Sequence, residues 1–336
     1  MTATAERRPP GRLRRFLDGE SHVDFIGRSR LWLVLALSSL AICALAVGIR
    51  GLNFGIDFTG GTSLIVENAT RSFTADNISD ALGELGVDEV VVQVTADNTG
   101  ALISTTSLGE VAGTQQREVV DRLAEVTGAP RDQIEVSAIG PRWGREISRQ
   151  ALRGLAVFLL LVTIYITFRF EWRMGVAALV TLLHDLLITV GVYALFGFQV
   201  TPASVIALLS ILGYSLYDTV VVFDRIDEDT DRLGSSSSRT YSDVANGSLN
   251  SVLVRSLSTS ITSLLPVGGL LFIGAQLLGA TTLQDLALAL FIGMAIGIYS
   301  SLTVATPLLC WLKEREPRYR ELRHRLETRR GGAVST

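Results

Sequence analysis

Six long apolar segments, separated by polar or charged stretches, dominate the pattern of this chain. They are Leu31–Ile49, Gly154–Phe168, Met174–Phe196, Pro202–Phe223, Ser256–Leu278 and Leu286–Leu312. About 20 predominantly apolar residues in a helix span a bilayer. The pattern therefore predicts a polytopic α-helical membrane protein with six transmembrane helices.

Arginines in the short connections predict the orientation of these helices. They cluster before the first segment, between the second and third, between the fourth and fifth, and after the sixth (Arg7, Arg8, Arg12, Arg14, Arg15, Arg28, Arg30, Arg169, Arg173, Arg225, Arg232, Arg239, Arg315, Arg318). Positively charged connections stay in the cytoplasm. We therefore expect both termini to be cytoplasmic and residues 50–150 to lie outside the cell.

The expected division of the chain follows from this orientation. A cytoplasmic tail over residues 1–30 precedes the first transmembrane helix at 31–49, and a domain outside the membrane covers 50–150. Helices two to six fall within 151–312, with a polar cytoplasmic linker at 224–250, and a basic cytoplasmic tail covers 313–336.

The outer segment has the pattern of a small α+β domain. Its expected order is strand, helix, strand, strand, helix, strand (Ser63–Glu67, Thr74–Leu85, Glu89–Thr95, Ala101–Thr105, Val111–Thr127 and Gln133–Ile139). Thr74 is a helix-capping residue, and Gly86 and Gly128 are helix terminators. This order is typical of the ferredoxin-like fold. The segment contains no His or Cys, so we expect a contact domain without catalysis.

Asp218 is the most informative residue, because it lies inside the fourth apolar segment. It is five residues from the inner end of that segment, about 8 Å along a helix. A charged side chain at the centre of a membrane helix costs about 2.5–3.5 kcal/mol on insertion scales, and such residues usually relay protons or ions. The alternative is a protonated, hydrogen-bonded Asp with a structural role only.

Arg255, at the start of the fifth segment, lies at a similar inner depth. An ion pair between Asp218 and Arg255 across adjacent helices is therefore geometrically allowed, and it would lower the insertion cost of both charges. The alternative is an interfacial anchor, because long cationic side chains often extend from a helix to the membrane surface.

Two further features lie within apolar segments. His184 and Asp185 sit near the middle of the third segment, where they form either a second relay or a hydrogen bond for helix packing. Gly293 and Gly297 in the sixth segment form a Gly-x-x-x-Gly motif, which indicates close helix packing.

The composition of the chain mainly excludes certain classes of partner and of chemistry. The net charge of −3 is too small to indicate an electrostatic partner, and no basic stripe suggests nucleic acid. Cys43 and Cys310 both lie in apolar segments and form no disulfide or zinc pattern. No phosphate-binding loop, nucleophile elbow, metal cage or dinucleotide fingerprint is present. We therefore expect no enzymatic activity, no cofactor and no metal.

Several separated motifs resemble the SecD/SecF family of protein-export membrane proteins. They are Asp57-Phe58-Thr59-Gly60-Gly61 with the two residues before it, Gly140-Pro141, His184-Asp185, the run from Gly213 through Asp218 to Asp224-Arg225, and Asn250 to Ser256. One departure is Tyr217, where the family often has Asn. Three features favour the SecF branch over the SecD branch: the form of the run from Asp218 to Ile226, the short N-terminus and the single outer domain of about 100 residues. The SecD branch carries a much larger outer region.

This resemblance implies a function and a set of partners. The family forms half of a resistance-nodulation-division (RND) type unit in the bacterial inner membrane, pairs with SecD beside the SecYEG channel, and uses the proton-motive force to assist export of a preprotein. YajC or YidC and membrane lipid are further implied partners. The implied proton relay is Asp218 with Arg255. Polar residues of the third and fourth segments are further candidates to support it (Asp185, His184, Tyr214, Ser215 and Thr219). The alternatives are a passive scaffold that assembles SecD, and a proton-coupled exporter of lipids or small molecules.

Overall fold

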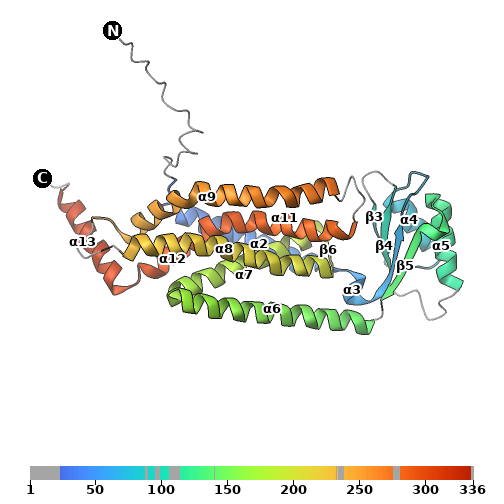
Figure 1. Cartoon of the computed structure of the whole chain (residues 1–336), viewed down its shortest axis with the longest axis horizontal. Coiled ribbons are helices and arrows are strands. Elements are labelled where there is room, and N and C mark those ends of the chain that lie inside the picture. Colours follow the sequence, from blue (N-terminus) through green and yellow to red (C-terminus); the bar gives the residue numbers. More distant parts are fainter. Residues whose placement is uncertain are drawn as a thin grey trace, which may run out of the picture.

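A computed structural model describes most of the chain, over residues 23–87, 90–94, 99–105, 114–139, 141–231, 233, 238–274 and 281–333. The molecule is a long helical bundle with a small sheet domain at one end (Figure 1). We call the two ends of the bundle the sheet end and the α13 end, after the helix α13 (Pro317–Ala333).

The prediction of six transmembrane helices is confirmed. Within the described residues, six helices are long and apolar enough to cross a membrane: Ser29–Arg50, Gly144–Arg169, Trp172–Phe196, Pro202–Asp231, Tyr241–Gly274 and Leu283–Lys313. They comprise α2 (Ser29–Arg50), α6 (Pro141–Arg169), α7 (Trp172–Phe196), α8 (Pro202–Asp231), α9 (Tyr241–Gly269), α11 (Thr281–Ser300) and α12 (Thr306–Lys313).

The helices extend beyond the apolar segments that predict them. The expected polar linker over 224–250 is largely helical, because α8 continues to Asp231 and α9 already begins at Tyr241. Within this polar stretch, Ile226 on α8 and Leu249 on α9 are both buried, so each helix has an apolar contact there that stabilises it. Thr240 starts α9 with a capping box to Asp243. At the sheet end, α6 begins at Pro141 and not near residue 150.

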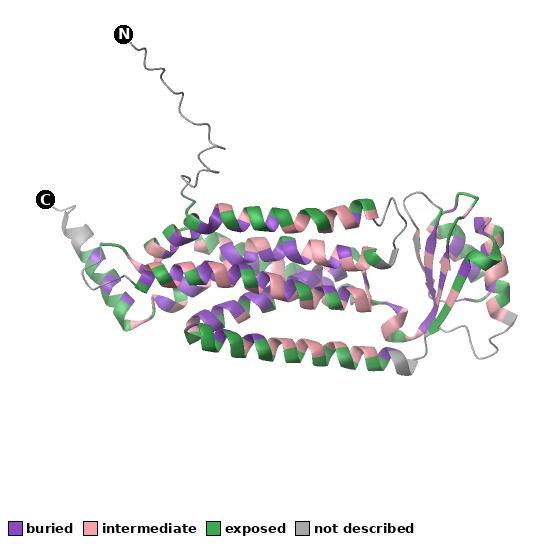
Figure 2. Cartoon of the chain, in the orientation of Figure 1, coloured by how far each residue is buried: buried purple, intermediate pink, exposed green. Residues whose placement is uncertain are grey.

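Burial divides the bundle into inner and outer helices (Figure 2). In the most apolar stretches of α7 and of the α11–α12 helix, 56% of the residues are buried. The corresponding shares are only 11% for α6 and 17% for α2 and α9. The core is therefore built around α7, α8 and α11, and the outer helices leave wide faces open to lipid or to a partner.

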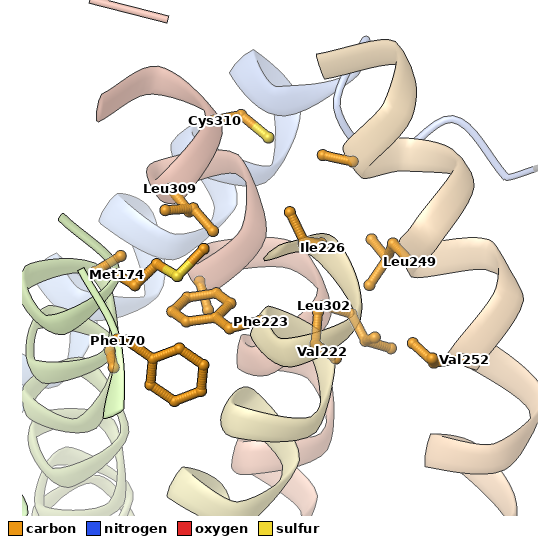
Figure 3. Close-up of a cluster of buried hydrophobic side chains, with 14 of the residues drawn as sticks. Phe170, Met174, Val222, Phe223, Ile226, Leu249, Val252, Leu302, Leu309 and Cys310 are labelled. Carbon is orange, nitrogen blue, oxygen red and sulfur yellow. The ribbon is translucent and has the colours of Figure 1, made fainter. Parts of the chain in front are cut away.

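An apolar cluster holds the bundle together at the α13 end (Figure 3). Phe170 and Met174 meet Phe223 of α8 and Leu309 of α12, and Leu249 of α9 joins the same cluster. Nearer the centre of the bundle, Gly293 permits close contact between α11 and α8. A Cβ atom on Gly293 would lie 2.3 Å from Cδ1 of Ile211. The predicted close packing at the Gly-x-x-x-Gly motif is therefore confirmed.

The sheet domain has the predicted order of elements. Its strands are β2 (Gly61–Val66), β3 (Val91–Val94), β4 (Ala101–Thr105) and β5 (Ile134–Ile139), and its helices are α4 (Ala75–Gly83) and α5 (Thr114–Thr127). The spatial order β3-β4-β2-β5 is antiparallel throughout. The ends of the predicted elements at Glu89, Thr95 and 111–113 lie outside the described residues.

A separate apolar core fills the space between this sheet and its two helices. Leu64, Ile78, Leu82, Ile103 and Leu123 are all fully buried in it. Because this core is not shared with the bundle, the sheet domain has what an independent folding unit needs.

We expect a purified fragment of residues 61–139 to fold without the membrane. Its far-ultraviolet circular dichroism should show mixed helix and sheet and a cooperative thermal transition. In the matched control Ile103→Asp, a charge is forced into the core, which should abolish the transition. A random-coil spectrum of the unmodified fragment would contradict the expectation.

Candidate functional site

A short joint connects the sheet domain to the bundle. It consists of β1 (Asn53–Phe54), which pairs in parallel with β6 (Gln199–Val200), and the one-turn helix α3 (Ile56–Thr59). The amide of Gly55 donates to the carbonyl oxygen of Val200 at 2.8 Å. The end of α2 is thus bound to the connection between α7 and α8. The apolar pattern of the sequence did not predict this pair of two-residue strands.

The motif residues Asp57, Phe58, Thr59, Gly60 and Gly61 all lie in this joint. Gly60 has φ +82°, a conformation that favours glycine. A Cβ atom on Gly61 would lie 2.4 Å from the carbonyl oxygen of Thr105. Burial raises the pKa of the Asp57 carboxyl above its ordinary value. The motif therefore forms the connection between α2 and the first strand of the sheet domain.

Asp218 lies inside the bundle, 7% exposed, and its hydrogen-bond partners are hydroxyl groups. Its Oδ1 accepts a hydrogen bond from Oγ of Ser256 on α9 at 2.5 Å, and its Oδ2 accepts one from Oγ of Ser301. No Arg or Lys among the described residues forms an ion pair with it. The carboxylate therefore joins three transmembrane segments through polar contacts alone.

The predicted ion pair between Asp218 and Arg255 is not formed in this structure. Ser256 occupies the position that faces Asp218, and Arg255, one residue earlier, is exposed on α9. Consecutive residues of an α-helix point roughly 100° apart, so both cannot face the same neighbour. Residue counts predict the depth of Arg255 along α9 correctly, but they do not predict its direction around the helix.

Asp185 on α7 lies in a second polar cluster and is completely buried. Its Oδ2 accepts hydrogen bonds from Oγ of Ser215 at 2.5 Å and from Oγ of Ser300 at 2.8 Å. Its Oδ1 lies 3.1 Å from Nδ1 of His184, and Nε2 of His184 lies 3.1 Å from the hydroxyl oxygen of Tyr299. The predicted His184–Asp185 feature is thus a connected network of four side chains around one carboxylate.

The sixth transmembrane helix supplies one hydroxyl to each carboxylate. Ser300 reaches Asp185 and Ser301 reaches Asp218, at the point where α11 passes into a π-helical segment over Ser301–Ala305. Such wider turns occur frequently at functional sites. Sequence reasoning missed both serines, although two adjacent hydroxyls within an apolar segment were a visible signal.

The remaining predicted residues do not join either cluster. Thr219 is buried and Tyr214 is half-buried, but neither donates to a carboxylate of the two clusters. Asp224 forms an ion pair with Arg169, and Arg225 pairs with Glu228 at 2.9 Å, both toward the α13 end. These motif residues therefore form exposed ion pairs at the α13 end of the bundle. No metal-binding group of three or more His, Cys, Asp or Glu side chains occurs in the described part of the chain.

Comparison with known proteins decides the family. The model for "Protein export membrane protein SecD/SecF, C-terminal" matches residues 119–315, and the SecD/SecF GG motif matches residues 45–67. The chain belongs to the SecD/SecF family. Its relatives include the protein translocase subunit SecF of Streptomyces coelicolor, 41% identical over 93% of this chain and 82% of that protein. The SecF subunit of Mycobacterium tuberculosis strain H37Rv is 39% identical over 95% of this chain and 73% of that protein.

A solved structure in the SecD/SecF family agrees with this assignment. The crystal structure of the translocon-associated membrane protein SecDF of Thermus thermophilus matches with a TM-score of 0.78 and 33% identity over 92% of this chain. A second form of SecDF, described as super-membrane-facing, matches with a TM-score of 0.63. The chain spans about two fifths of the length of that SecDF structure. It is thus a multi-pass membrane protein of the same architecture as part of SecDF.

Proposed function

We propose that this chain is a SecF-type subunit that assists protein export by means of the proton-motive force, with Asp218 as a proton-binding group. The observation that carries the proposal is the buried Asp218 carboxyl group, held by serine hydroxyls from two neighbouring helices inside a transmembrane bundle. An uncompensated charge in this environment is costly, so gain or loss of one proton changes the energy of the site strongly.

Protonation changes the hydrogen bonds of Asp218 in a defined way. As a carboxylate it accepts from both Ser256 and Ser301. As an acid, one of its oxygens becomes a donor, so one of the two hydroxyls has to turn. Ser301 has a second acceptor available, because its Oγ lies 3.2 Å from the carbonyl oxygen of Ile298. Proton binding at Asp218 would therefore loosen the contact between α8 and the π-helical segment after α11.

The membrane potential supplies enough free energy per proton to shift a protein between two conformations. One charge crossing the membrane potential supplies about 2.3 kcal/mol per 100 mV. Two conformations of a protein commonly differ by a few kcal/mol, so a proton current of this size can drive the chain between them.

The proposed setting follows the SecF and SecDF relatives. SecD is the proposed obligate partner, with SecYEG, YajC or YidC and the translocating preprotein as further contacts. We place the chain in the bacterial inner membrane, with both termini in the cytoplasm and residues 50–150 outside as a ferredoxin-like domain. Its strand order β3-β4-β2-β5 supports that fold. We propose no enzymatic activity for the chain itself.

Export in inverted membrane vesicles that contain SecD and SecYEG tests the proposal. Vesicles with the chain should complete export faster than vesicles without it, and the difference should vanish when a protonophore removes the proton-motive force. A difference that persists with the protonophore would identify a passive scaffold for SecD. Export of lipid, with no effect on preprotein, would favour the exporter.

Arg255 remains part of the proposed relay. It lies next to Ser256, so a rotation of α9 by roughly 100° would bring its guanidinium toward Asp218 in place of the hydroxyl. Arg255→Leu should lose the proton-motive-force-dependent part of export, and Arg255→Lys should keep a part of it, because lysine keeps the charge without the planar fork. The measurement is the export rate at equal membrane levels. Full activity of Arg255→Leu would make Arg255 an interfacial anchor.

A further inference from the structure

We infer that Asp185 and His184 form a second proton-binding site, coupled to Asp218 through the adjacent hydroxyls of Ser300 and Ser301. This inference rests on the proposed function, because it adds a step to the proton path through Asp218. It starts from an observation that the proposed function leaves unused: a second carboxyl group, completely buried in the same bundle.

The partners of Asp185 show how a proton would be held there. Two of them are serine hydroxyls, and the third is the imidazole of His184, at 3.1 Å. No Arg or Lys of the described residues forms an ion pair with Asp185. A buried carboxylate beside a neutral imidazole would leave a net negative charge without compensation. One added proton removes that charge, whether it resides on the carboxyl group or on the ring.

The other ionisable groups near His184 and Asp185 are not placed to bind the neutralising proton in their stead. Tyr299 from α11 contacts the far nitrogen of His184, and Cys43 of α2 contacts the carbonyl oxygen of Ile188 on α7. Asp218 is acidic as well, and Arg255 is exposed on α9. The proton that neutralises the cluster is therefore shared by His184 and Asp185.

The geometry connects this pair to Asp218. Ser215, which donates to Asp185, and Asp218 are three residues apart on α8, so they lie on one face and about 4.5 Å apart along the axis. Ser300 and Ser301 are consecutive and donate to the two different carboxyl groups. Any rearrangement of the turn that carries both serines therefore changes the hydrogen bonds of both sites together.

Both serines also have an alternative acceptor. Oγ of Ser300 lies 3.2 Å from the carbonyl oxygen of Gly297, and Oγ of Ser301 lies 3.2 Å from that of Ile298. Each hydroxyl can thus turn away when its carboxyl group binds a proton. Asp185 lies nearer the sheet end than Asp218, because its partner Ser215 precedes Asp218 on α8. In the coupled step the His184–Asp185 pair therefore releases one proton, and Asp218 gains that proton and changes from carboxylate to acid. The serines end with one hydroxyl hydrogen each, and no bond between heavy atoms changes.

A cavity of about 1300 Å³ leads from His184 toward the α13 end. At its deep end it is lined by His184, Leu40 and Leu187, and at the other end by charged residues that include Arg30 and Glu314. Thr303 adds a polar group along the way. The proposed topology places the charged end in the cytoplasm. The second site therefore borders a cavity that extends toward the inner side and is lined mainly by apolar side chains between its two ends.

Proton uptake and preprotein export by the complex with SecD test this inference. In proteoliposomes with a pH-sensitive dye inside, Asp185→Asn should lose proton flux and the proton-motive-force-dependent part of export, while Asp185→Glu should recover part of both. Thr181→Val is the matched control. Thr181 is also buried on α7, but its hydroxyl donates only to the main-chain oxygen of Ala177, so this variant should stay at the level of the unmodified chain.

Infrared spectroscopy across pH separates a proton site from a packing role. Two carboxyl bands should titrate, one lost in Asp185→Asn and one in Asp218→Asn. Ser300→Ala, which removes no ionisable group, should change the titration of both bands. If these bands titrate independently in the unmodified chain and in Ser300→Ala, the coupling is wrong, even if Asp185→Asn fails to accumulate.

The two proposals fail in different ways. If Asp185→Asn keeps full proton flux while Asp218→Asn has none, the second site is wrong and the proposed function stands. If both variants keep full flux and full export, the proposed function is wrong, and the second site falls with it.

Discussion

Asp218→Asn is expected to abolish the proton-motive-force-dependent part of export while the protein still reaches the membrane and binds SecD. Asparagine has nearly the shape of aspartate, and its amide can still bond to Ser256 and Ser301, so packing should persist. It cannot exchange a proton. One proton crossing a potential of 100 mV contributes about 2.3 kcal/mol. Loss of this contribution corresponds to about a fiftyfold fall in rate. The measurement is export in inverted vesicles with and without a protonophore.

Asp224→Asn is the matched control for this experiment. Asp224 lies on the same helix, but it is exposed and paired with Arg169. An exposed ion pair contributes at most about 1 kcal/mol, so this variant should export like the unmodified chain. Normal proton-dependent export by Asp218→Asn would remove Asp218 from the mechanism.

Gly191→Ala should have the largest effect on stability among single-methyl changes in the bundle. A Cβ atom at this position of α7 would lie 2.0 Å from Cβ of Cys43 and 2.8 Å from its Cα on α2. Neither atom can move without the backbone, so α2 and α7 have to separate. Overpacking of this kind costs typically about 1–3 kcal/mol and occasionally more. The melting temperature of the protein in detergent should fall accordingly.

Gly48→Ala provides the comparison. Gly48 lies on α2 five residues after Cys43, and a Cβ atom there would meet no other atom within 4 Å. Alanine also has the better helix propensity, by about 1 kcal/mol. The control should therefore be neutral or stabilising in the helix. Equal melting temperatures for Gly191→Ala and Gly48→Ala would show that α2 and α7 do not pack as closely as described.

The six membrane helices were predictable because a helix that spans a bilayer needs about 20 predominantly apolar residues, and runs of this length are visible in the sequence. The same holds for Asp218 and Asp185, since ionisable residues stand out in such runs. The order of elements in the sheet domain was also predictable, because strands and helices alternate there with clear caps at Thr74 and Gly128.

The contacts inside the bundle were not predictable. Depth along a helix follows from residue counts, but direction around it depends on how the helices pack. For this reason the sequence predicts Arg255 as the partner of Asp218, whereas in the structure its neighbour Ser256 donates to the carboxyl group. The π-helical turn after Ser300 likewise has no signature in the apolar pattern. The helical ends of α8 and α9 within 224–250 were not predictable either, because the buried positions in this stretch are spread among polar residues and form no apolar run.

The joint formed by β1 and β6 has a mechanical consequence. Val200, bonded to Gly55 of the joint, is followed almost at once by Pro202, the first residue of α8. Asp218 lies sixteen residues further along this one continuous helix, about 24 Å away. A tilt of about 10° around the carboxyl group would then shift the Pro202 end of α8 by about 4 Å at that length. Because the joint also begins the sheet domain, a tilt of α8 would move the sheet domain as well. Under the proposed function, a change at Asp218 would therefore be transmitted to the sheet domain.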